Sequence, residues 1–198
     1  MKKAPDRSQF SVRKLTSRYY DAVVSIDREC ADSFWNREDF KNQCNKDDSS
    51  ILVLLHKSTP VGFVAYEYMK EDGEIHILNM GLRSKYRRMK LGTMLLDRVK
   101  LKMKNSYKLL QLVVRETNYT AQLFLKNNGF RARLVRNYFV DYLQNRTIRE
   151  DGYCFEYHKE ITNTGTSYSC SKATNSSGFV SYDTRELKRR LAGNKANP

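Results

Sequence analysis

Long apolar runs are missing from this 198-residue sequence. No segment is long enough to cross a bilayer, and no apolar stretch follows the basic residues at the N-terminus, so we expect neither a membrane span nor a secretory signal. Short paired cysteine spacings are missing too, which argues against a zinc site or a dithiol redox motif. We therefore expect no metal site and a reducing, cytoplasmic location for the four scattered cysteines, Cys30, Cys44, Cys154 and Cys170.

Internal repeats, zinc-finger spacings and the aromatic platform of single-strand binders are also absent, which disfavours nucleic-acid binding as the primary role. What stands out instead is a formal net charge of +14. A charge of this size favours polyanionic partners, namely nucleic acid, a ribosome surface or a phosphate-rich cofactor. A basic surface that serves only solubility would have the same composition.

The composition changes along the chain. The hydrophobic fraction of 40% suffices for one compact core. From Ile161 onward, however, the sequence is rich in Ser, Thr, Asn and Gly, which cannot offset the entropy lost when a chain becomes ordered. We expect a folded domain over residues 1–160 and a tail over 161–198, with a possible short helix at 183–191 that contains Lys188, Arg189 and Arg190.

Hydrophobic periodicity predicts a succession of strands and helices. Turn residues at 57–60 and 71–73 separate three strands of an antiparallel meander, Asn36 and Asp39 fit a capping box, and Asn128-Gly129 fits a helix end. The predicted strands are 10–15, 51–56, 61–69, 74–82, 109–114, 130–139 and 152–159, and the predicted helices lie within 19–30, after 36, at 91–99 and at 119–127. We expect a polar, mobile connection between the last two strands, with Asp141, Asn145, Arg146 and Arg149.

The most informative segment is 79–93, which joins the end of a predicted strand to the start of a predicted helix. A helix N-terminus presents unpaired backbone N–H groups and the positive end of its dipole, so a loop around it can hold a pyrophosphate. Gly92 would let the backbone approach a phosphate closely, and Thr93 could add a hydroxyl donor. Arg87, Arg88 and Lys90 would add electrostatic attraction, although a basic loop that merely caps a helix would look similar.

Within this segment, Arg87-Arg88-Met89-Lys90-Leu91-Gly92 resembles the pyrophosphate loop Arg/Gln-x-x-Gly-x-Gly/Ala of the GNAT acetyltransferases. Lys90 stands where the first glycine is usual. Because lysine does not easily take a positive φ, we expect either a slightly shifted loop or a dispensable glycine. The resemblance implies a GNAT fold of class α/β (α+β), with a mixed, mostly antiparallel sheet of about seven strands flanked by about four helices.

The resemblance covers roughly residues 10–159 and is closest to the ribosomal-protein-alanine N-acetyltransferases (RimI-like). Local matches are Phe34-Trp35, the segments 114–118 (VRETN) and 128–130 (NGF), and the segments 136–139 (RNYF) and 149–151 (RED). The resemblance implies that acetyl-CoA is the co-substrate. Its implied contacts are Met80, Gly81, Leu82, Arg87, Arg88, Met89, Lys90, Leu91, Gly92, Thr93 and Asn118, and the implied substrate-groove residues are Phe34, Trp35 and Tyr138.

The catalytic residues depart from the family pattern. In RimI-like enzymes a glutamate on the fifth strand is the usual base and a tyrosine on the next helix the usual acid, but the corresponding positions here are Val113 and Leu125. His76 is our candidate base because imidazole titrates near neutral pH. A partly buried structural histidine is an equally valid interpretation. Glu74 and Glu116 are weaker candidates, and either could be only a solvated carboxylate.

The resemblance implies transfer of an acetyl group from acetyl-CoA to an amine, and the N-terminal amine of a ribosomal or other protein is the leading acceptor. The basic tail could then contact ribosomal RNA. Two alternatives stay open: acetylation of a lysine or a small-molecule amine, and a coenzyme A binding scaffold that has lost its proton carriers.

Overall fold

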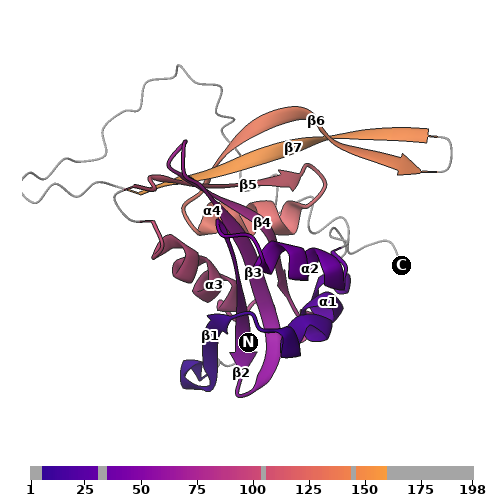
Figure 1. Cartoon of the computed structure of the whole chain (residues 1–198). Coiled ribbons are helices and arrows are strands. Elements are labelled where there is room, and N and C mark those ends of the chain that lie inside the picture. The colour runs from indigo at the N-terminus through magenta and orange to yellow at the C-terminus, as the bar shows by residue number, and fades with distance from the viewer. Residues whose placement is uncertain (1–5, 31–34, 104–105, 144–145, 160–198) are drawn as a thin grey trace, which may run out of the picture. The chain divides into compact units, whose positions relative to one another are not determined.

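The structure, a computed structural model, describes residues 6–30, 35–103, 106–143 and 146–159, and the side chains of residues 135–149 lie outside this description. The chain divides into two compact units, Met1–Leu110 and Gln111–Pro198. The described residues form four α-helices and seven strands, so the expected α/β class is confirmed (Figure 1). The expected tail over 161–198, with its possible helix at 183–191, lies outside the described residues.

Four antiparallel strands form the sheet of the first unit, in the order in which they occur in the chain. They are β1 (Phe10–Lys14), β2 (Ser49–His56), β3 (Thr59–Met69) and β4 (Glu74–Leu82). The expected meander of three strands is therefore confirmed. Lys57 and Gly73 take positive φ values of 56° and 68° in the two turns between β2, β3 and β4.

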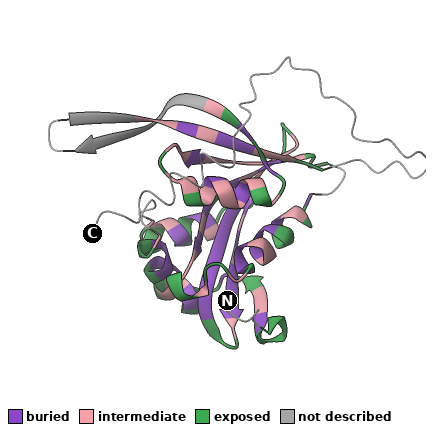
Figure 2. Cartoon of the chain, turned by 180° about the vertical axis from the view of Figure 1, so that it is seen from behind, coloured by how far each residue is buried: buried purple, intermediate pink, exposed green. Residues whose placement is uncertain are grey.

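Two helices, α1 (Tyr20–Arg28) and α2 (Arg37–Cys44), pack against one face of these strands. Their buried side chains share a core with alternate residues of β2 and β3, including Ile51, Val53, Phe63 and Ala65 (Figure 2). Alternate residues of a strand point to the same face, so from Phe63 onward the odd-numbered side chains of β3 face α1 and α2. The capping box expected at the start of α2 is present.

The third helix of this unit, α3 (Leu91–Lys100), lies on the opposite side of the strands from α1 and α2 (Figure 1). It contacts β3 through a fully buried apolar stripe, as the helical spacing predicts. The stripe consists of Leu91, Leu95, Leu96 and Val99. Since the first residue of this stripe is also the first residue of the helix, packing fixes the start of α3 in place.

In the second unit the strand order is β5-β7-β6, and β6 and β7 are antiparallel. The elements are β5 (Leu109–Arg115), which begins at the unit boundary, α4 (Tyr119–Asn127), β6 (Arg131–Leu143) and β7 (Arg146–His158). Gly129 ends α4 with a φ of 85°, as expected.

The expectation of a loop around residues 141–149 is wrong. Asp141 lies in β6, and Arg146 and Arg149 lie in β7, where Val140 pairs with Arg149. A ladder between two strands uses backbone N–H and C=O groups only, so polar side chains do not end it. Asn145 is outside the described residues.

Candidate active site

A β-bulge interrupts β4 directly before the expected cofactor residues. Asn79 pairs with Ala65 of β3 and Ile77 pairs with Tyr66, so Leu78 is an extra residue on β4. A bulge of this kind leaves one residue out of the ladder and bends the strand, and it re-aims the residues that follow. Met80, Gly81 and Leu82 come next and form the last residues of β4.

Gly81 lies where no larger residue fits. A Cβ atom at this position would lie 2.9 Å from Cε1 of Phe63 and 3.1 Å from Sγ of Cys30. The strand end is therefore in close contact with β3 and with Cys30, which lies two residues after the end of α1. Sequence reasoning selected Gly81 as a cofactor residue, and the structure adds a packing reason for it.

The loop that follows β4 has an unusual backbone for its composition. After a short 3₁₀-helix, η3 (Ser84–Tyr86), Arg88 and Lys90 take φ values of 66° and 58°. Each left-handed non-glycine residue costs about 1–2 kcal/mol. Of our two alternatives for position 90, a shifted loop or a dispensable glycine, the second holds: Lys90 itself adopts the left-handed conformation that a glycine would adopt without strain.

The loop ends at the N-terminus of α3. The first hydrogen bond that the helix uses there runs from the N–H of Met94 to the carbonyl oxygen of Lys90, over 3.2 Å. The helix therefore makes no use of the N–H groups of Leu91, Gly92 and Thr93, and the side chain of Lys90 does not cap them. These three donors and the exposed side chains of Arg88 and Lys90 have the character of an anion site.

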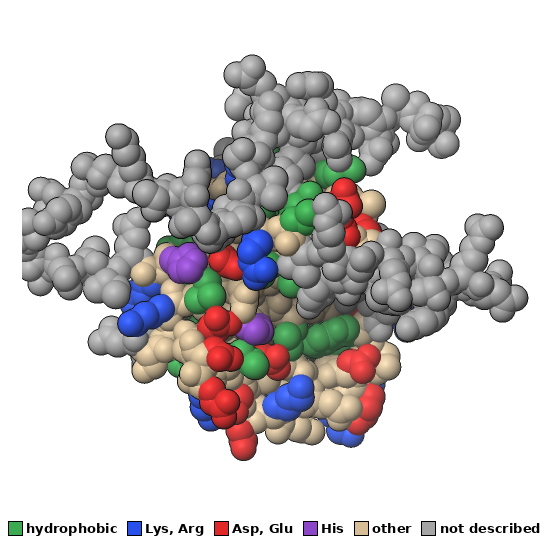
Figure 3. All heavy atoms as spheres, turned by 90° about the horizontal axis from the view of Figure 1, so that it is seen from above, with side chains coloured by type: hydrophobic (Ala, Val, Ile, Leu, Met, Phe, Trp, Pro, Cys, Tyr) green, Lys and Arg blue, Asp and Glu red, His purple; other side chains and the backbone are tan. Residues whose placement is uncertain are grey.

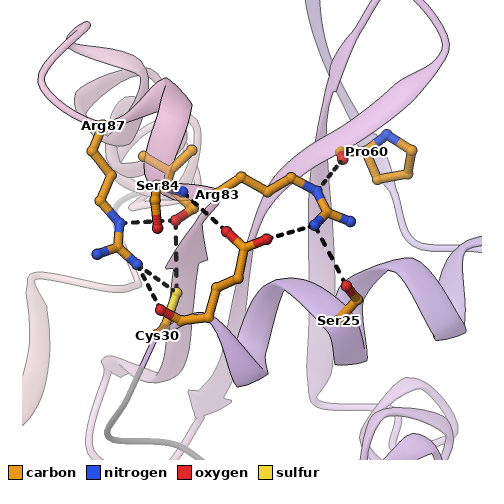
Figure 4. Close-up of polar contacts among 8 residues, drawn as sticks. Ser25, Cys30, Pro60, Arg83, Ser84 and Arg87 are labelled. Carbon is orange, nitrogen blue, oxygen red and sulfur yellow. Dashed lines mark hydrogen bonds and ion pairs between the residues drawn. The ribbon is translucent and has the colours of Figure 1, made fainter.

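Arg87, the first residue of the motif, serves the loop itself. Its Nε donates to the carbonyl oxygen of Leu82 over 3.0 Å, and one terminal nitrogen donates to the carbonyl oxygen of Glu29 over 3.1 Å (Figure 4). The same nitrogen lies 3.4 Å from Sγ of Cys30. The guanidinium thus joins the end of β4 to the end of α1.

Glu29, which sequence reasoning missed, binds the same loop with its carboxylate. Oε2 accepts a hydrogen bond from the N–H of Ser84 over 3.1 Å, and Oε1 accepts one from Arg83 over 2.7 Å (Figure 4). The bond from Ser84 lowers the pKa of the Glu29 carboxyl, and the Arg83 guanidinium adds to this against the effect of burial. No local pattern could have found this contact, since Glu29 and Arg83 are separated by 54 residues.

His76 and Glu74, two of the candidate proton carriers, lie together on β4. Nε2 of His76 is 2.8 Å from Oε2 of Glu74, and their side chains are 30% and 24% exposed. His76 pairs with Glu67 of β3, whose side chain points to the same face of the sheet as that of Ala65. His76 and Glu74 are therefore on the sheet face that α1 and α2 cover, and they are still reachable from solvent.

Asp27, also missed by sequence reasoning, is a fully buried carboxylate on the same face. Its Oδ1 accepts a hydrogen bond from Nδ2 of Asn79 over 3.0 Å, and its Oδ2 accepts one from the N–H of Trp35 over 2.9 Å. Trp35 is partly buried and packs edge-on against Phe40, so a core role for its ring is evident. Phe34, its expected partner in the substrate groove, lies outside the described residues.

The second unit contains the remaining candidates. Asn118 is the N-cap of α4 and accepts a hydrogen bond from the N–H of Ala121 over 3.0 Å. Glu116 donates its N–H to Asp151 and accepts a hydrogen bond at its carbonyl oxygen from the buried Gln122. The expected groove residue Tyr138 is in β6, and its side chain lies outside the described part of the chain.

Two of the sequence motifs meet in this unit. Glu150 accepts hydrogen bonds from Arg115 over 2.9 Å and from the N–H and hydroxyl of Thr117 over 2.9 and 2.6 Å. The segment after β5 and the segment inside β7 are thereby joined. Leu125 is buried in α4 and Val113 is half-buried in β5, so the two positions that lack proton carriers are apolar in the structure as well.

None of the helices in the described part of the chain combines the length and hydrophobicity that a membrane crossing requires. Nor does that part of the chain bring together three His, Cys, Asp or Glu side chains in a group able to hold a metal ion.

Comparison with known proteins places these features in context. The model of the acetyltransferase (GNAT) family matches residues 20–130, more than half of the chain. No curated protein matches by sequence. Among solved structures, the ribosomal-protein-S18-alanine N-acetyltransferase of Escherichia coli is 20% identical with a TM-score of 0.64, and the match covers 80% of this chain and 99% of that one.

Two further structures are similar. Ard1 of Thermoplasma volcanium is 19% identical with a TM-score of 0.67, over 77% of this chain and 99% of its own. NAA60 of Arabidopsis thaliana, solved in complex with a bisubstrate analogue, is 20% identical with a TM-score of 0.64, over 75% of this chain and 97% of its own. At these identities the structural matches support the fold.

Proposed function

This chain belongs to the acetyltransferase (GNAT) family, and we propose that the amine it acetylates is the N-terminal amine of a protein. It is an N-acetyltransferase whose co-substrate is acetyl-CoA. Similar structures favour a protein N-terminus: one is a ribosomal-protein-S18-alanine N-acetyltransferase, and another was solved with a bisubstrate analogue. The structural observation that carries the proposal is the pair His76–Glu74, partly exposed on the β4 strand that leads to the anion site.

Acetyl-CoA fits the residues at the start of α3. Its pyrophosphate needs several donors and positive charge, which the N–H groups of Leu91, Gly92 and Thr93 and the side chains of Arg88 and Lys90 offer. Met80, Gly81 and Leu82 at the end of β4 would bind the pantetheine arm, with Asn118 as a further contact. Bound acetyl-CoA supplies an acetyl group that its thioester already activates.

The protein then has to position the amine and move one proton. A neutral amine attacks the thioester carbon, the new C–N bond forms, and the C–S bond breaks. His76 accepts the proton that the amine nitrogen loses, and Glu74 holds the imidazole and stabilises its charged form. The departing thiolate takes a proton from solvent, since neither Val113 nor Leu125 can donate one. Glu116 is a weaker candidate for the base.

We assign stabilisation of the oxyanion to a backbone N–H of β4 next to the bulge at Leu78. Backbone donors held in a rigid strand need no reorganisation during the reaction, which makes them effective at this task. The buried contact between Asp27 and Asn79 supports this assignment, because it fixes the residue that follows Leu78.

Thiol release from acetyl-CoA with a panel of peptides tests the reaction. Peptides with a free N-terminus should release coenzyme A, and the same peptides with a blocked N-terminus and an internal lysine should not. Acetylation of the blocked peptides would support lysine acetylation, turnover of small amines alone would support a metabolite acceptor, and tight coenzyme A binding without turnover on any amine would support a scaffold.

His76→Gln tests the base. We expect a loss of kcat/KM of about a hundredfold or more with unchanged coenzyme A affinity. His158→Gln is the matched control, because His158 also lies two residues from a glutamate on a strand, at 3.7 Å from Glu156, but is 60% exposed. Equal activity of His76→Gln and the wild type would exclude His76 as the base and leave Glu116 to be tested.

A contact with the ribosome through the basic tail completes the proposal. On the face that Figure 3 shows, Asp and Glu side chains lie among Lys and Arg side chains, so the described part of that face has no continuous basic patch. The tail residues Lys188, Arg189 and Arg190 offer RNA a further source of attraction. Truncation after residue 160 should abolish salt-sensitive co-sedimentation with ribosomes, and unchanged co-sedimentation would exclude this role.

The reaction would take place in the cytosol. Cys30, Cys44 and Cys154 form no disulfide in the described part of the chain, which is the state that a reducing compartment favours. Fractionation of cells that express the tagged protein tests this location.

A further inference from the structure

The anion-binding loop carries strain that its own sequence does not relieve. Arg88 and Lys90 are both left-handed, with φ values of 66° and 58°. Side chains other than glycine persist in this conformation only where the surrounding structure fixes them. Contacts outside the motif must therefore hold the loop, and those contacts decide whether the N–H groups of Leu91, Gly92 and Thr93 stay aligned.

Glu29 provides three of these contacts from beyond the end of α1. Its carboxylate accepts hydrogen bonds from Arg83 over 2.7 Å and from the N–H of Ser84 over 3.1 Å. Its carbonyl oxygen accepts a third from Arg87 over 3.1 Å (Figure 4). A single residue thereby fixes the first, second and fifth residues of the loop, directly before the two left-handed positions.

A second, separate contact holds Tyr86. Its hydroxyl is 3.0 Å from Nδ1 of His56 on β2, and its ring packs edge-on against Phe10 at a centroid distance of 6.1 Å. This contact does not involve Glu29. Removal of the Glu29 carboxylate should therefore loosen the loop without releasing it completely.

We propose that Glu29 is a positioning residue for the binding of acetyl-CoA. Glu29 holds the loop in the geometry that a glycine at position 90 would otherwise favour. The proposal rests on the proposed use of the Leu91–Thr93 N–H groups for the pyrophosphate. Glu29 takes no part in the proton transfer, so its effect is on cofactor binding and not on the chemical step. Its side chain is 36% exposed, and partly exposed ion pairs contribute little to global stability.

The experiment compares Glu29→Ala and Glu29→Gln with Asp21→Ala. Asp21, near the start of α1, forms an exposed ion pair with Arg37 of α2, so its removal is a matched control. In calorimetric titrations with coenzyme A we expect Glu29→Ala to bind about tenfold more weakly, with a similar rise in the KM for acetyl-CoA and less than a twofold change in kcat. Glu29→Gln keeps an acceptor for the Ser84 N–H, so its loss should be smaller.

Lys90→Gly provides the decisive second arm. Glycine takes the left-handed conformation without strain, so the loop should need Glu29 less. We expect Glu29→Ala to weaken coenzyme A binding by about threefold or less in the Lys90→Gly background, against about tenfold in the wild type. The same loss in both backgrounds would mean that Glu29 does not act by holding the strained loop, and the proposal would fail.

Failure of the proposal and failure of the function are distinguishable. Wild-type affinity in Glu29→Ala would overturn the positioning role and leave the acetyl-CoA site intact. Absence of coenzyme A binding in the wild type would overturn the site itself. In that case amide exchange decides about the loop: faster exchange of residues 88–93 in Glu29→Ala than in Asp21→Ala supports the positioning role, and equal exchange overturns it.

Discussion

Asn79 Nδ2 donates a hydrogen bond to Asp27 Oδ1 over 3.0 Å, which joins β4 to α1 in the buried interior across 52 residues of sequence. Asp27 accepts a second hydrogen bond from the N–H of Trp35, so one carboxylate fixes both the strand beside the bulge and the chain that leads into α2. Two residues later, Glu29 binds the loop that follows β4. The end of α1 thus positions both β4 and the loop that follows it.

The first prediction concerns this buried carboxylate. Asp27→Asn should lower the free energy of unfolding by about 1–3 kcal/mol, because the amide presents N–H groups to one of the two donors that now bind Asp27. Asp27→Ala should be more destabilising, by about 2–4 kcal/mol, since it removes both acceptors and leaves a cavity. Urea titrations measure both changes.

Asp21→Asn is the control for this prediction, because it makes the same chemical change at an exposed position of the same helix. Its urea midpoint should match that of the wild type. Equal midpoints for Asp27→Asn and Asp21→Asn would show that the buried contact does not stabilise the fold.

The second prediction concerns the strained loop. Lys90→Gly should raise the free energy of unfolding by about 0.5–1 kcal/mol, because the relief of the left-handed strain exceeds the larger entropy loss of glycine. Lys57 has a φ of 56° in the turn between β2 and β3, so Lys57→Gly should also raise the free energy of unfolding.

Lys85→Gly provides the opposite case in the same loop. Lys85 lies in η3 and is not among the residues with positive φ, so glycine there relieves no strain, carries an entropic cost and removes the cation–π contact with Tyr86. Its midpoint in urea should fall while that of Lys90→Gly rises. A fall in both would contradict the strain argument.

The third prediction concerns Gly81. A methyl group there would lie 2.9 Å from Phe63 and 3.1 Å from Cys30, so Gly81→Ala should destabilise the fold by about 1–3 kcal/mol through overpacking. It should also raise the KM for acetyl-CoA, because the end of β4 has to shift. Adding Cys30→Ala should recover part of the stability by relieving one of the two contacts, and a purely additive double variant would speak against this packing explanation.

Local signals predicted the parts of the fold that local physics determines. Asn36 and Asp39 cap α2 through hydrogen bonds to backbone groups within three residues, so a four-residue segment contains the whole motif. The end of α4 was predictable because it depends on one residue alone: Gly129 takes a positive φ, which glycine adopts without strain. At Lys90 the same reasoning left two alternatives open, because the left-handed conformation of a lysine depends on contacts from elsewhere in the chain.

The residues missed were those whose partners are far away in sequence. Asp27 and Glu29 look like ordinary helix residues, and only the fold shows that one is buried against Asn79 and the other binds Arg83 and Ser84. The length of β6 and β7 was missed for a related reason. Backbone pairing between β6 and β7 extends through Asp141 and Arg149. A hydrophobic pattern reports side chains only, so it could not predict this extension.

The last prediction concerns pH. The pKa of the Glu150 carboxyl lies below its ordinary value of 4.5, because hydrogen bonds from Thr117 and Arg115 together outweigh the opposing effect of burial. A lowered folded-state pKa means that the carboxylate stabilises the fold above about pH 4.5 and that this contribution is lost as the pH falls through the folded-state value. At pH 7, Glu150→Gln should therefore be less stable than the wild type by about 2 kcal/mol.

This difference should shrink as the pH falls from 5 to 3, because protonation removes from the wild type the charge that the variant already lacks. Urea titrations at several pH values measure it. Glu38→Gln, which removes an exposed carboxylate paired with Lys41, should follow the wild type throughout. A difference between Glu150→Gln and the wild type that stays constant with pH would mean that the ionised carboxylate does not hold β7 to the segment after β5, and that the hydrogen bonds to Thr117 act equally well from a neutral group.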